Sequence, residues 1–390
     1  MRIPAGLVIG LLLATVPALA HDPSAWGGAF RSRDGGATWM PIDAGLFVGG
    51  AVALAIDPTN PNHILLATDT RLLRSRNGGR DWSQEPASRF VGPTLAVAFD
   101  SSGEVLLAAT AAGVFRSDGG AGWNAIDLPS WALPARSIVA GSAAGRFYLN
   151  GAHGLFRSAD RGQTWTRVAE ALPDAPFTAI AVLAQPSETV AAILEGRVLT
   201  SANAGTSWQL HSAGLPDGEK LESIVADPSP GRVWAGAMGR LYRSDDTAQT
   251  WHSVGEALPQ PGTRVRGIAA STDAATIVLT TDRGVYRSAD AGKTWTLIEG
   301  NLPVHLESGP LVRDRSDLAT LYAGFSLTPY DEIWRRAVEG SNLLAQLDPF
   351  SLAGGAAFLI LLALAAIYSV RRLSRFARRA EATPTRPPAA

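Results

Sequence analysis

One short pattern, Ser-x-Asp-x-Gly-x-Thr-Trp, recurs seven times in this chain and constrains its fold more than any other feature. The copies are SRDGGATW (32–39), SRNGGRDW (75–82), SDGGAGW (117–123), SADRGQTW (158–165), SANAGTSW (201–208), SDDTAQTW (244–251) and SADAGKTW (288–295). Their closing tryptophans follow one another at intervals of 41 to 44 residues. A period of this length, kept along the chain, is typical of repeat folds in which each unit is one supersecondary motif.

Each unit contains four short segments that are suited to β-strands. In the second unit they are 51–56, 63–68 and 72–75, followed by a segment that begins at Trp82. Turn residues separate them, and helical periodicity is absent from this part of the chain. The 40 glycines and 25 prolines fit a chain with many turns. Four short strands per unit are typical of one blade of a β-propeller.

The two ends of the repeat region complete the blade count. Residues 25–44 hold the second half of a unit and residues 308–336 hold the first half. The sequence therefore predicts an all-β, seven-bladed propeller of four-stranded antiparallel blades over residues 21–340. We expect N- and C-terminal strands to pair and close the ring, which leaves no exposed sheet edge. Ile333-Trp334-Arg335 resembles a third strand that competes with Phe30-Arg31, so an eight-bladed ring is the alternative.

The residues of the repeated motif are expected to stabilise one hairpin per blade. Its Asp or Asn can accept backbone N–H bonds, its Gly supplies an unusual conformation, and its Trp packs a large apolar face. A metal or sugar site in each copy is the alternative. The third copy is one residue short and the sixth has Ala248 in place of Gly, so we expect distorted hairpins there. The predicted structural residues are Asp34, Trp39, Asn77, Trp82, Asp118, Trp123, Asp160, Trp165, Asn203, Trp208, Asp246, Trp251, Asp290 and Trp295.

An arginine precedes the motif's serine in six of the seven units. These arginines are Arg31, Arg74, Arg116, Arg157, Arg243 and Arg287. A ring of them could bind an acidic partner. Alternatively, each could cover its own blade with its aliphatic stem.

The two ends of the chain predict a membrane-anchored protein. Residues 1–20 read as a secretory signal peptide, with Arg2, an apolar run and an Ala-Leu-Ala cleavage site. Residues 350–370 carry no charge and would form a helix of about 31 Å, which matches the thickness of a bilayer.

Five arginines follow this apolar segment within nine residues, so the positive-inside rule predicts a cytoplasmic C-terminus. We therefore expect a linker at 341–349, one transmembrane helix at 350–370 and a basic, disordered cytoplasmic tail at 371–390. The protein would be a single-pass protein of the cytoplasmic (inner) membrane, with its propeller in the periplasm or extracellular space.

Composition excludes several kinds of site. The chain has no cysteine, which rules out disulfides, thiolate metal sites and cysteine nucleophiles. Its six histidines show no metal-like spacing, so no metal and no cofactor are predicted. The formal net charge of -1 becomes -7 once residues 1–20 and 371–390 are set aside. An acidic body argues against a nucleic-acid partner, because phosphate binding needs clustered positive charge.

Propellers usually act at one mouth of the central channel, where loops join the last strand of one blade to the first strand of the next. These loops carry aromatic and charged side chains, a mixture that suits a protein or glycan surface. The candidate binding residues are Arg89, Phe90, Trp131, Arg136, Lys220, Glu222, Arg264, Arg266, His305 and Glu307. No catalytic residue is predicted.

The motif resembles the Asp-box, or BNR repeat, of sialidase-like propellers. That resemblance implies the propeller fold, and two enzyme classes share it. Sialidases need an arginine triad, a Tyr nucleophile with a Glu partner and an Asp, whereas inverting xyloglucan-degrading enzymes need two carboxylates across a cleft. The tyrosines outside the predicted membrane segment are Tyr148, Tyr242, Tyr286, Tyr322 and Tyr330.

The units also resemble those of the photosystem II assembly/stability factor family, as in residues 63–82 and 146–165. This resemblance implies a non-enzymatic binder that helps to assemble membrane complexes. We therefore predict a scaffold or assembly module whose partner is another extracytoplasmic or membrane protein. A glycan-binding protein or glycoside hydrolase acting at the channel mouth is the alternative.

Overall fold

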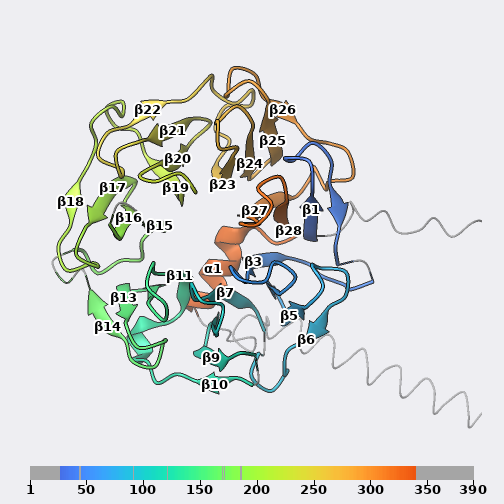
Figure 1. Cartoon of the computed structure of the whole chain (residues 1–390), viewed down its shortest axis with the longest axis vertical. Coiled ribbons are helices and arrows are strands. Elements are labelled where there is room, and N and C mark those ends of the chain that lie inside the picture. Colours follow the sequence, from blue (N-terminus) through green and yellow to red (C-terminus); the bar gives the residue numbers. More distant parts are fainter. Residues whose placement is uncertain are drawn as a thin grey trace, which may run out of the picture. The chain divides into compact units, whose positions relative to one another are not determined.

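The computed structural model describes residues 27–339, except 44, 91, 121, 169, 171, 185 and 186. Its strands form seven four-stranded antiparallel sheets around a common axis (Figure 1). The predicted seven-bladed propeller is therefore confirmed. The ring lies within one compact unit of the chain, which ends at Val338.

Each blade contributes its strands in order from the axis outward. The innermost strands are β3 (Ala51–Ile56), β7 (Thr94–Phe99), β11 (Ala135–Ala140), β15 (Ala179–Leu183), β19 (Leu221–Ala226), β23 (Val265–Ala270) and β27 (Glu307–Arg313). The second strands are β4 (Ile64–Thr68), β8 (Val105–Thr110), β12 (Phe147–Gly151), β16 (Thr189–Leu194), β20 (Val233–Ala237), β24 (Ile277–Thr281) and β28 (Leu321–Ser326). The third strands are β5 (Leu72–Ser75), β9 (Val114–Asp118), β13 (Gly154–Ser158), β17 (Arg197–Ser201), β21 (Leu241–Ser244), β25 (Gly284–Ser288) and β1 (Gly28–Ser32).

The outermost strands are two or three residues long. They are β6 (Ser83–Gln84), β10 (Asn124–Ala125), β14 (Thr166–Val168), β18 (Gln209–Leu210), β22 (His252–Ser253), β26 (Thr296–Leu297) and β2 (Met40–Pro41). A 3₁₀ helix, η2 (Ser130–Ala132), lies between the second and third blades. Very short outer strands limit the exposed hydrogen-bonding edge of each blade.

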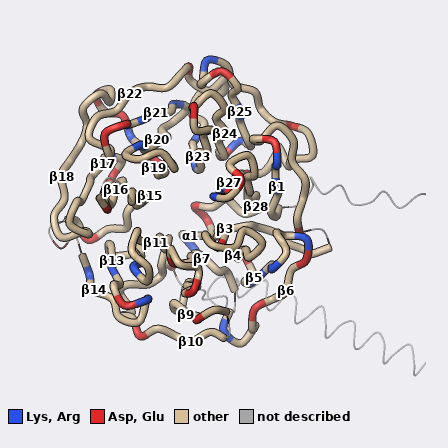
Figure 2. The backbone as a smooth tube through the Cα atoms, viewed as in Figure 1, with Lys and Arg blue, Asp and Glu red and all other residues tan. Residues whose placement is uncertain are grey.

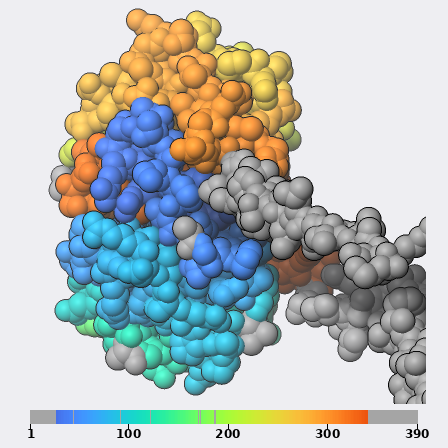
Figure 3. All heavy atoms as spheres, turned by 90° about the vertical axis from the view of Figure 1, so that its right-hand side faces the viewer, coloured from blue at the N-terminus to red at the C-terminus, as the bar shows by residue number. Residues whose placement is uncertain are grey.

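The last blade is assembled from both ends of the repeat region. Its strand order is β2-β1-β28-β27, and β1 pairs with β28 from Gly28 opposite Phe325 to Ser32 opposite Leu321. In side view the blue N-terminal and orange C-terminal segments lie next to each other (Figure 3). The predicted closure of the ring is confirmed.

The segment predicted as a possible extra strand is instead helical. Residues 330–339 form helix α1 (Tyr330–Glu339), which includes Ile333, Trp334 and Arg335 and lies over the centre of the ring (Figure 1). The strand prediction for Ile333-Trp334-Arg335, and with it the eight-bladed alternative, is wrong. Pro329 precedes the helix, acidic residues occupy its first turn and Arg336 its last turn, all of which favour a helix.

The core consists of seven clusters of buried apolar side chains, one at each interface between neighbouring blades. At the closing interface, for example, Ala29 and Tyr322 of the last blade pack with Ile64 and Leu66 of β4. Each sheet is therefore covered on both faces by its neighbours. This explains why the second strands β4, β8 and β16 are buried at every position.

The repeated motif forms a hydrogen-bonded hairpin between the third and fourth strands. In the last copy, the Ser288 hydroxyl donates to Asp290, while it accepts the Gly292 N–H. Asp290 in turn accepts the N–H and the hydroxyl of Thr294. The first, fourth and sixth copies make the same bonds. In these four copies the motif therefore holds its own hairpin together.

The two irregular copies behave differently. Ala248 adopts φ 66° and donates its N–H to Ser244 at 2.9 Å, so the sixth hairpin is intact and the expected distortion there is wrong. In the shortened third copy, Asp118 instead pairs with Arg116, and the buried Ser117 hydroxyl has no partner among the described residues. The hairpin therefore depends on the spacing between Ser and Trp more than on the Gly itself.

Four of the repeated arginines join neighbouring blades. Each donates to the carbonyl of the fourth residue of the next motif, a residue with positive φ. The pairs are Arg31 to Gly78 at 2.6 Å, Arg116 to Arg161 at 2.6 Å, Arg157 to Ala204 at 3.2 Å and Arg287 to Gly35 at 3.0 Å. Neither of the two roles expected for these arginines includes this bond, which makes them links between blades.

The predicted signal peptide (1–20), linker (341–349), transmembrane helix (350–370) and tail (371–390) lie outside the described residues. Within the part of the chain that the structure describes, no helix has the length and apolar character that crossing a membrane requires.

Replacing Arg287 tests the link between the blade of β23 to β26 and the last blade. Arg287→Ala removes a charged donor from the Gly35 carbonyl, so we expect the free energy of unfolding to fall by about 1–2 kcal/mol. Urea denaturation followed by circular dichroism measures it. Lys293→Ala, an exposed substitution in the same blade, is the matched control. Equal midpoints for the two variants would contradict a structural role for Arg287.

The hairpin carboxylates predict acid sensitivity. Burial raises the pKa of Asp34 and Asp246. The hydrogen bonds that these carboxylates accept from Thr38 or Thr250 and from the motif serine lower the pKa by more than burial raises it. At Asp290 the hydrogen bonds from Thr294 are the largest cause of the lowered pKa. The pKa of each is lowered to about 2. Because the folded pKa lies below the unfolded value, this stabilisation is present above about pH 4 and is lost as the pH falls towards 2.

Asparagine at these three positions should remove that dependence. Asn77 and Asn203 already occupy the same place in two hairpins, so the fold accepts the change. We expect the combined variant Asp34→Asn, Asp246→Asn, Asp290→Asn to lose less stability than the wild type between pH 4 and pH 2. Urea midpoints at both values measure this, and parallel losses would contradict the assignment.

Candidate functional site at the channel mouth

The innermost strands begin at one end of the ring, which we call the channel mouth. Near this end, the pairing of first and second strands shifts in register between Ala135 and Ser137, Leu221 and Ser223, and Val265 and Gly267. The skipped residues are Arg136, Glu222 and Arg266. A bulge redirects the side chain of its extra residue. The bulges thus explain how three strands bring charged groups to the mouth.

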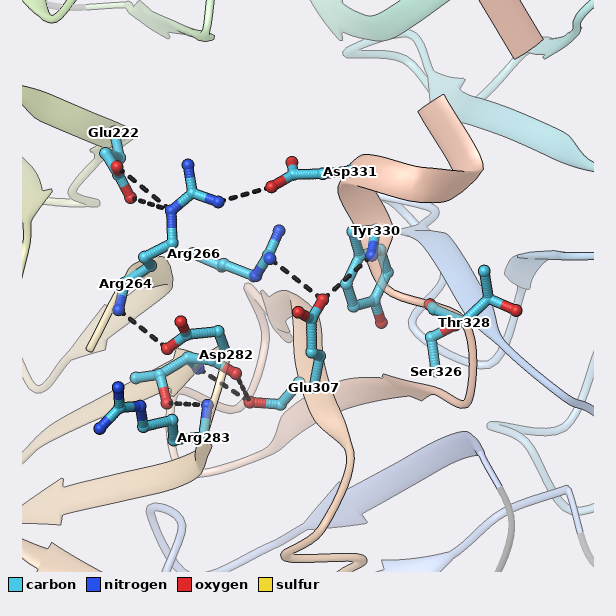
Figure 4. A network of polar contacts seen from close by, with 12 residues as sticks. Glu222, Arg264, Arg266, Asp282, Arg283, Glu307, Ser326, Thr328, Tyr330 and Asp331 are labelled. Carbon is cyan, nitrogen blue, oxygen red and sulfur yellow. Dashed lines mark hydrogen bonds and ion pairs between the residues drawn. The ribbon is translucent and has the colours of Figure 1, made fainter. Parts of the chain in front are cut away.

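Arg264 stands at the centre of a charged network between two blades and helix α1 (Figure 4). Its Nε lies 3.1 Å from Glu222 Oε2, and its Nη1 lies 2.5 Å from Asp331 Oδ2 on α1. Its backbone N–H donates to Asp282 at 2.9 Å. Burial lowers the pKa of Arg264, but the two carboxylates outweigh it and raise the pKa. Arg264 therefore stays charged and bridges the blades to the helix.

Tyr330 anchors the first turn of α1 (Figure 4). Its hydroxyl donates to the Ala51 carbonyl at 2.8 Å and its N–H donates to Glu307 Oε2 at 3.0 Å. Arg266 pairs with the same carboxylate at 3.0 Å and stacks over the Tyr330 ring at 5.2 Å. The ring packs directly on Gly309, since a Cβ there would lie 2.1 Å from Tyr330 Cζ. Burial raises the pKa of Tyr330, which keeps the phenol protonated.

Arg136 completes the cluster from the third blade. Its guanidinium lies over the Trp334 ring of α1, 5.4 Å from the centroid. Burial lowers its pKa; the charges of Arg264 and Arg266 act in the same direction, while Asp331 opposes them. Three arginines therefore repel one another at this mouth, and acidic groups relieve the repulsion.

Two cavities adjoin the helix. One of about 340 Å³ contains Arg136, Lys220, Glu222, Arg264 and Asp331 on its wall. The other, of about 350 Å³, is lined by Val52, Leu95, Arg136, Pro310 and Tyr330, among others. Elsewhere on the ring, residues of both signs are interspersed around the blades (Figure 2). The mouth thus combines Arg136, Lys220, Arg264 and Arg266 with the carboxylates Glu222, Glu307 and Asp331 around open space.

Six of the ten predicted binding residues come together here, and four do not. The six are Arg136, Lys220, Glu222, Arg264, Arg266 and Glu307. Arg89 and His305 are exposed on connecting loops. Trp131 is 45% exposed and packs between Phe156 and Arg167 of the third and fourth strands, away from the axis. Phe90 is only 2% exposed, because it packs against Phe115 and Trp123, so it is a core residue rather than a surface residue.

The sequence interpretation missed the residues that α1 brings to the mouth. Tyr330, Ile333 and Trp334 recur at intervals of three and one residues, which is the spacing of one helical face. Together with Pro329 and the acidic first turn, this spacing could have revealed the helix. Its position over the mouth could not have been found, because no repeat unit contains it.

The five tyrosines in the part of the chain that the structure describes do not form the site that sialidases need. Tyr148, Tyr242, Tyr286 and Tyr322 are at most 3% exposed, and the Tyr330 hydroxyl is bonded beneath α1. Tyr148 and Tyr242 donate to Glu188 and Glu219 at 2.7 Å. Burial and that bond raise the pKa of Tyr242 to about 12. Buried phenols with raised pKa values are poor nucleophiles.

Sequence comparisons place the chain among β-propellers. Residues 195–313 match the family model described as the DUF6242 beta propeller domain. A xyloglucanase from a Paenibacillus species is 29% identical over 181 residues, which cover 36% of this chain and 17% of that enzyme. This chain therefore spans less than a fifth of the xyloglucanase.

Structural comparisons give the same fold. YCF48 bound to a D1 peptide superimposes with a TM-score of 0.56 at 19% identity, covering 80% of this chain and 98% of the YCF48 chain. The GH74 xyloglucanase from Xanthomonas campestris gives a TM-score of 0.51 at 19% identity, covering 71% of this chain and 53% of the enzyme. The chain has the Asp-box propeller fold that its repeats predict, and these similarities establish that fold alone.

Substituting Gly309 tests how α1 is held. A methyl group there would collide with the Tyr330 ring. Such overpacking would destabilise bound α1 by about 1–3 kcal/mol. The population of protein with α1 released would then rise at least about fivefold. We expect Gly309→Ala to speed tryptic cleavage after Arg335 and Arg336, measured by mass spectrometry. Gly300→Ala, whose added Cβ would meet nothing within 4 Å, is the matched control. Equal cleavage rates would show that Tyr330 does not hold the helix.

Proposed function

We propose that this protein is a membrane-tethered, extracytoplasmic propeller that binds another protein at its channel mouth and acts as an assembly or scaffold module. The observation that carries the proposal is that the mouth already holds a polypeptide segment. Helix α1 is bound there through the Ala51 carbonyl, through Glu307 and through three arginines. A surface that binds a helix of its own chain has the chemistry to bind a segment of another chain.

The charge of the mouth indicates the kind of segment. Lys220 is exposed, Arg136 makes no hydrogen bond within the described residues, and both line the cavity beside α1. An acidic segment would relieve the repulsion between these cations. YCF48, a protein of the same fold, has been solved with a D1 peptide bound, which supports a peptide as the ligand class.

The tether is inferred from sequence. The apolar segment 350–370 and the arginines after it favour a single span of the cytoplasmic membrane with a cytoplasmic tail. Helix α1 ends at residue 339, and a linker over 341–349 could extend at most about 32 Å. A propeller tethered by so short a linker would find its partners at the membrane, so a membrane protein is the favoured partner.

A glycan ligand or a glycoside hydrolase activity is the second candidate. The observation that favours it is the similarity to xyloglucanases in both comparisons. Against it, Glu222 at the mouth is engaged by Arg264, and α1 covers the channel.

Affinity purification tests the proposed function. The tagged full-length protein is purified from gently solubilised native membranes and its partners are quantified by mass spectrometry. We expect a stoichiometric membrane protein whose recovery falls about tenfold or more in Lys220→Glu, because a reversed charge repels an acidic segment.

Arg89→Glu is the matched control, since it reverses an exposed charge on another connecting loop. The proposal would be overturned if the wild-type protein recovered no more partner than an anchor-only control and no more than Lys220→Glu. Hydrolysis of xyloglucan by the purified protein would favour the second candidate.

A further inference from the structure

Helix α1 rests on the propeller without being part of its packing. None of the seven inter-blade clusters contains a residue of α1, and the ring is closed by β1 and β28 alone. Of the ten residues of α1, all of which are described, only Ile333 is buried. The surface beneath the helix, which we call the α1 seat, therefore exists whether or not the helix occupies it. The α1 seat comprises Ala51, Arg136, Arg264, Arg266, Glu307 and Gly309.

The contacts between α1 and its seat are few and lie mostly at the N-terminal end of the helix. Tyr330 and Asp331 make hydrogen bonds and an ion pair to the blades, and Trp334 adds a cation-π contact. Asp331 is 52% exposed at its side chain, and ion pairs with that exposure contribute little. Glu332 forms ion pairs with Arg335 and Arg336 of the same helix and not with a described residue of the blades. Such contacts can be exchanged for similar ones from another chain.

The positive charge of the α1 seat favours its occupation by another segment once α1 has left. The positive end of the helix dipole points at a cluster of three arginines, an arrangement that Asp331 and Glu307 compensate. When α1 leaves, Asp331 leaves with it and the seat gains net positive charge. A segment that supplies an aromatic ring to Gly309 and a carboxylate to Arg264 would restore both contacts.

We propose that α1 is a displaceable internal occupant of the partner site, and that the partner segment which replaces it carries an aromatic residue next to an acidic residue. This inference rests on the proposed function, because it takes the channel mouth as the binding surface. Free protein would hold α1 on its seat, and binding of the partner would release it. Release would free the segment that leads towards residues 350–370, so that occupancy of the propeller alters the chain on its membrane side.

A peptide assay tests this without the native partner. The probe is a fluorescent synthetic peptide with the sequence of residues 328–339, and its affinity for the full-length protein in detergent is measured by anisotropy. In the wild type, α1 competes at the high effective concentration of a tethered segment. Tyr330→Ala weakens α1 and leaves the seat intact. We expect it to bind the peptide about tenfold more tightly than the wild type, within the usual range of coupling between competing sites.

Two controls locate the peptide on the seat. Gly309→Ala, added to Tyr330→Ala, should abolish binding because it fills the place of the tyrosine ring, whereas Gly300→Ala should not. A peptide in which Tyr330 is replaced by Ala should not bind either variant. Equal affinity of wild type and Tyr330→Ala, or binding that survives Gly309→Ala, would overturn the proposal.

A second measurement does not weaken α1 at all. Because the chain has no cysteine, spin labels can be placed at Met238→Cys and Val338→Cys, two exposed positions on the blades and on α1. Saturating peptide should change a narrow distance distribution into a broad one, and an unchanged distribution would overturn the proposal. The two proposals can fail separately. If the peptide releases α1 but the affinity purification captures no partner, this inference stands and the proposed function is refuted. The converse result would refute the inference alone.

Discussion

The pairing of β1 with β28 is the contact on which the rest of this structure depends. Every blade presents two apolar faces, and each face is covered only by the next blade around the ring. An open array would leave two such faces and the edge of β28 in water, whereas the closed ring covers them. Closure brings Gly28–Ser32 beside Leu321–Ser326, and so it fixes the first motif against the last complete blade. The fold is therefore cooperative around the ring although its units are local.

The hairpin motif contributes to that cooperativity in a way that its own bonds do not reveal. The fourth residue of the motif has positive φ, and its carbonyl accepts an arginine from the preceding blade at four interfaces. The same backbone position serves the turn and the interface. This explains why Ala248 is tolerated after Thr247 at φ 65°, since the turn uses main-chain groups and the serine hydroxyl. It also explains why a missing residue in the third copy disturbs more than a changed side chain.

The repeats made the fold predictable, because the same strand pattern appears seven times and the other units resolve any segment that is ambiguous in one unit. The segment 330–339 has no such support. Three residues, Ile333-Trp334-Arg335, fit a strand as well as a helix, and only the flanking Pro329 and acidic turn distinguish them. The site was predictable where its residues start the innermost strands, as for Arg264 and Arg266. Phe90 was not, since a loop residue that turns inward between blades has the same sequence character as one that turns outward.

A ring packed at every interface has little freedom to change shape, because close-packed interfaces resist continuous deformation. Its channel mouth is correspondingly rigid, with bulged strands that hold Arg136, Glu222 and Arg266 in place. Helix α1 differs in kind, since buried Ile333, the Tyr330 ring on Gly309 and a few polar contacts hold it. Elements with little burial are the ones that open at low free-energy cost. Within the described residues, helix α1 is therefore an element that can move at low free-energy cost while the ring keeps its shape.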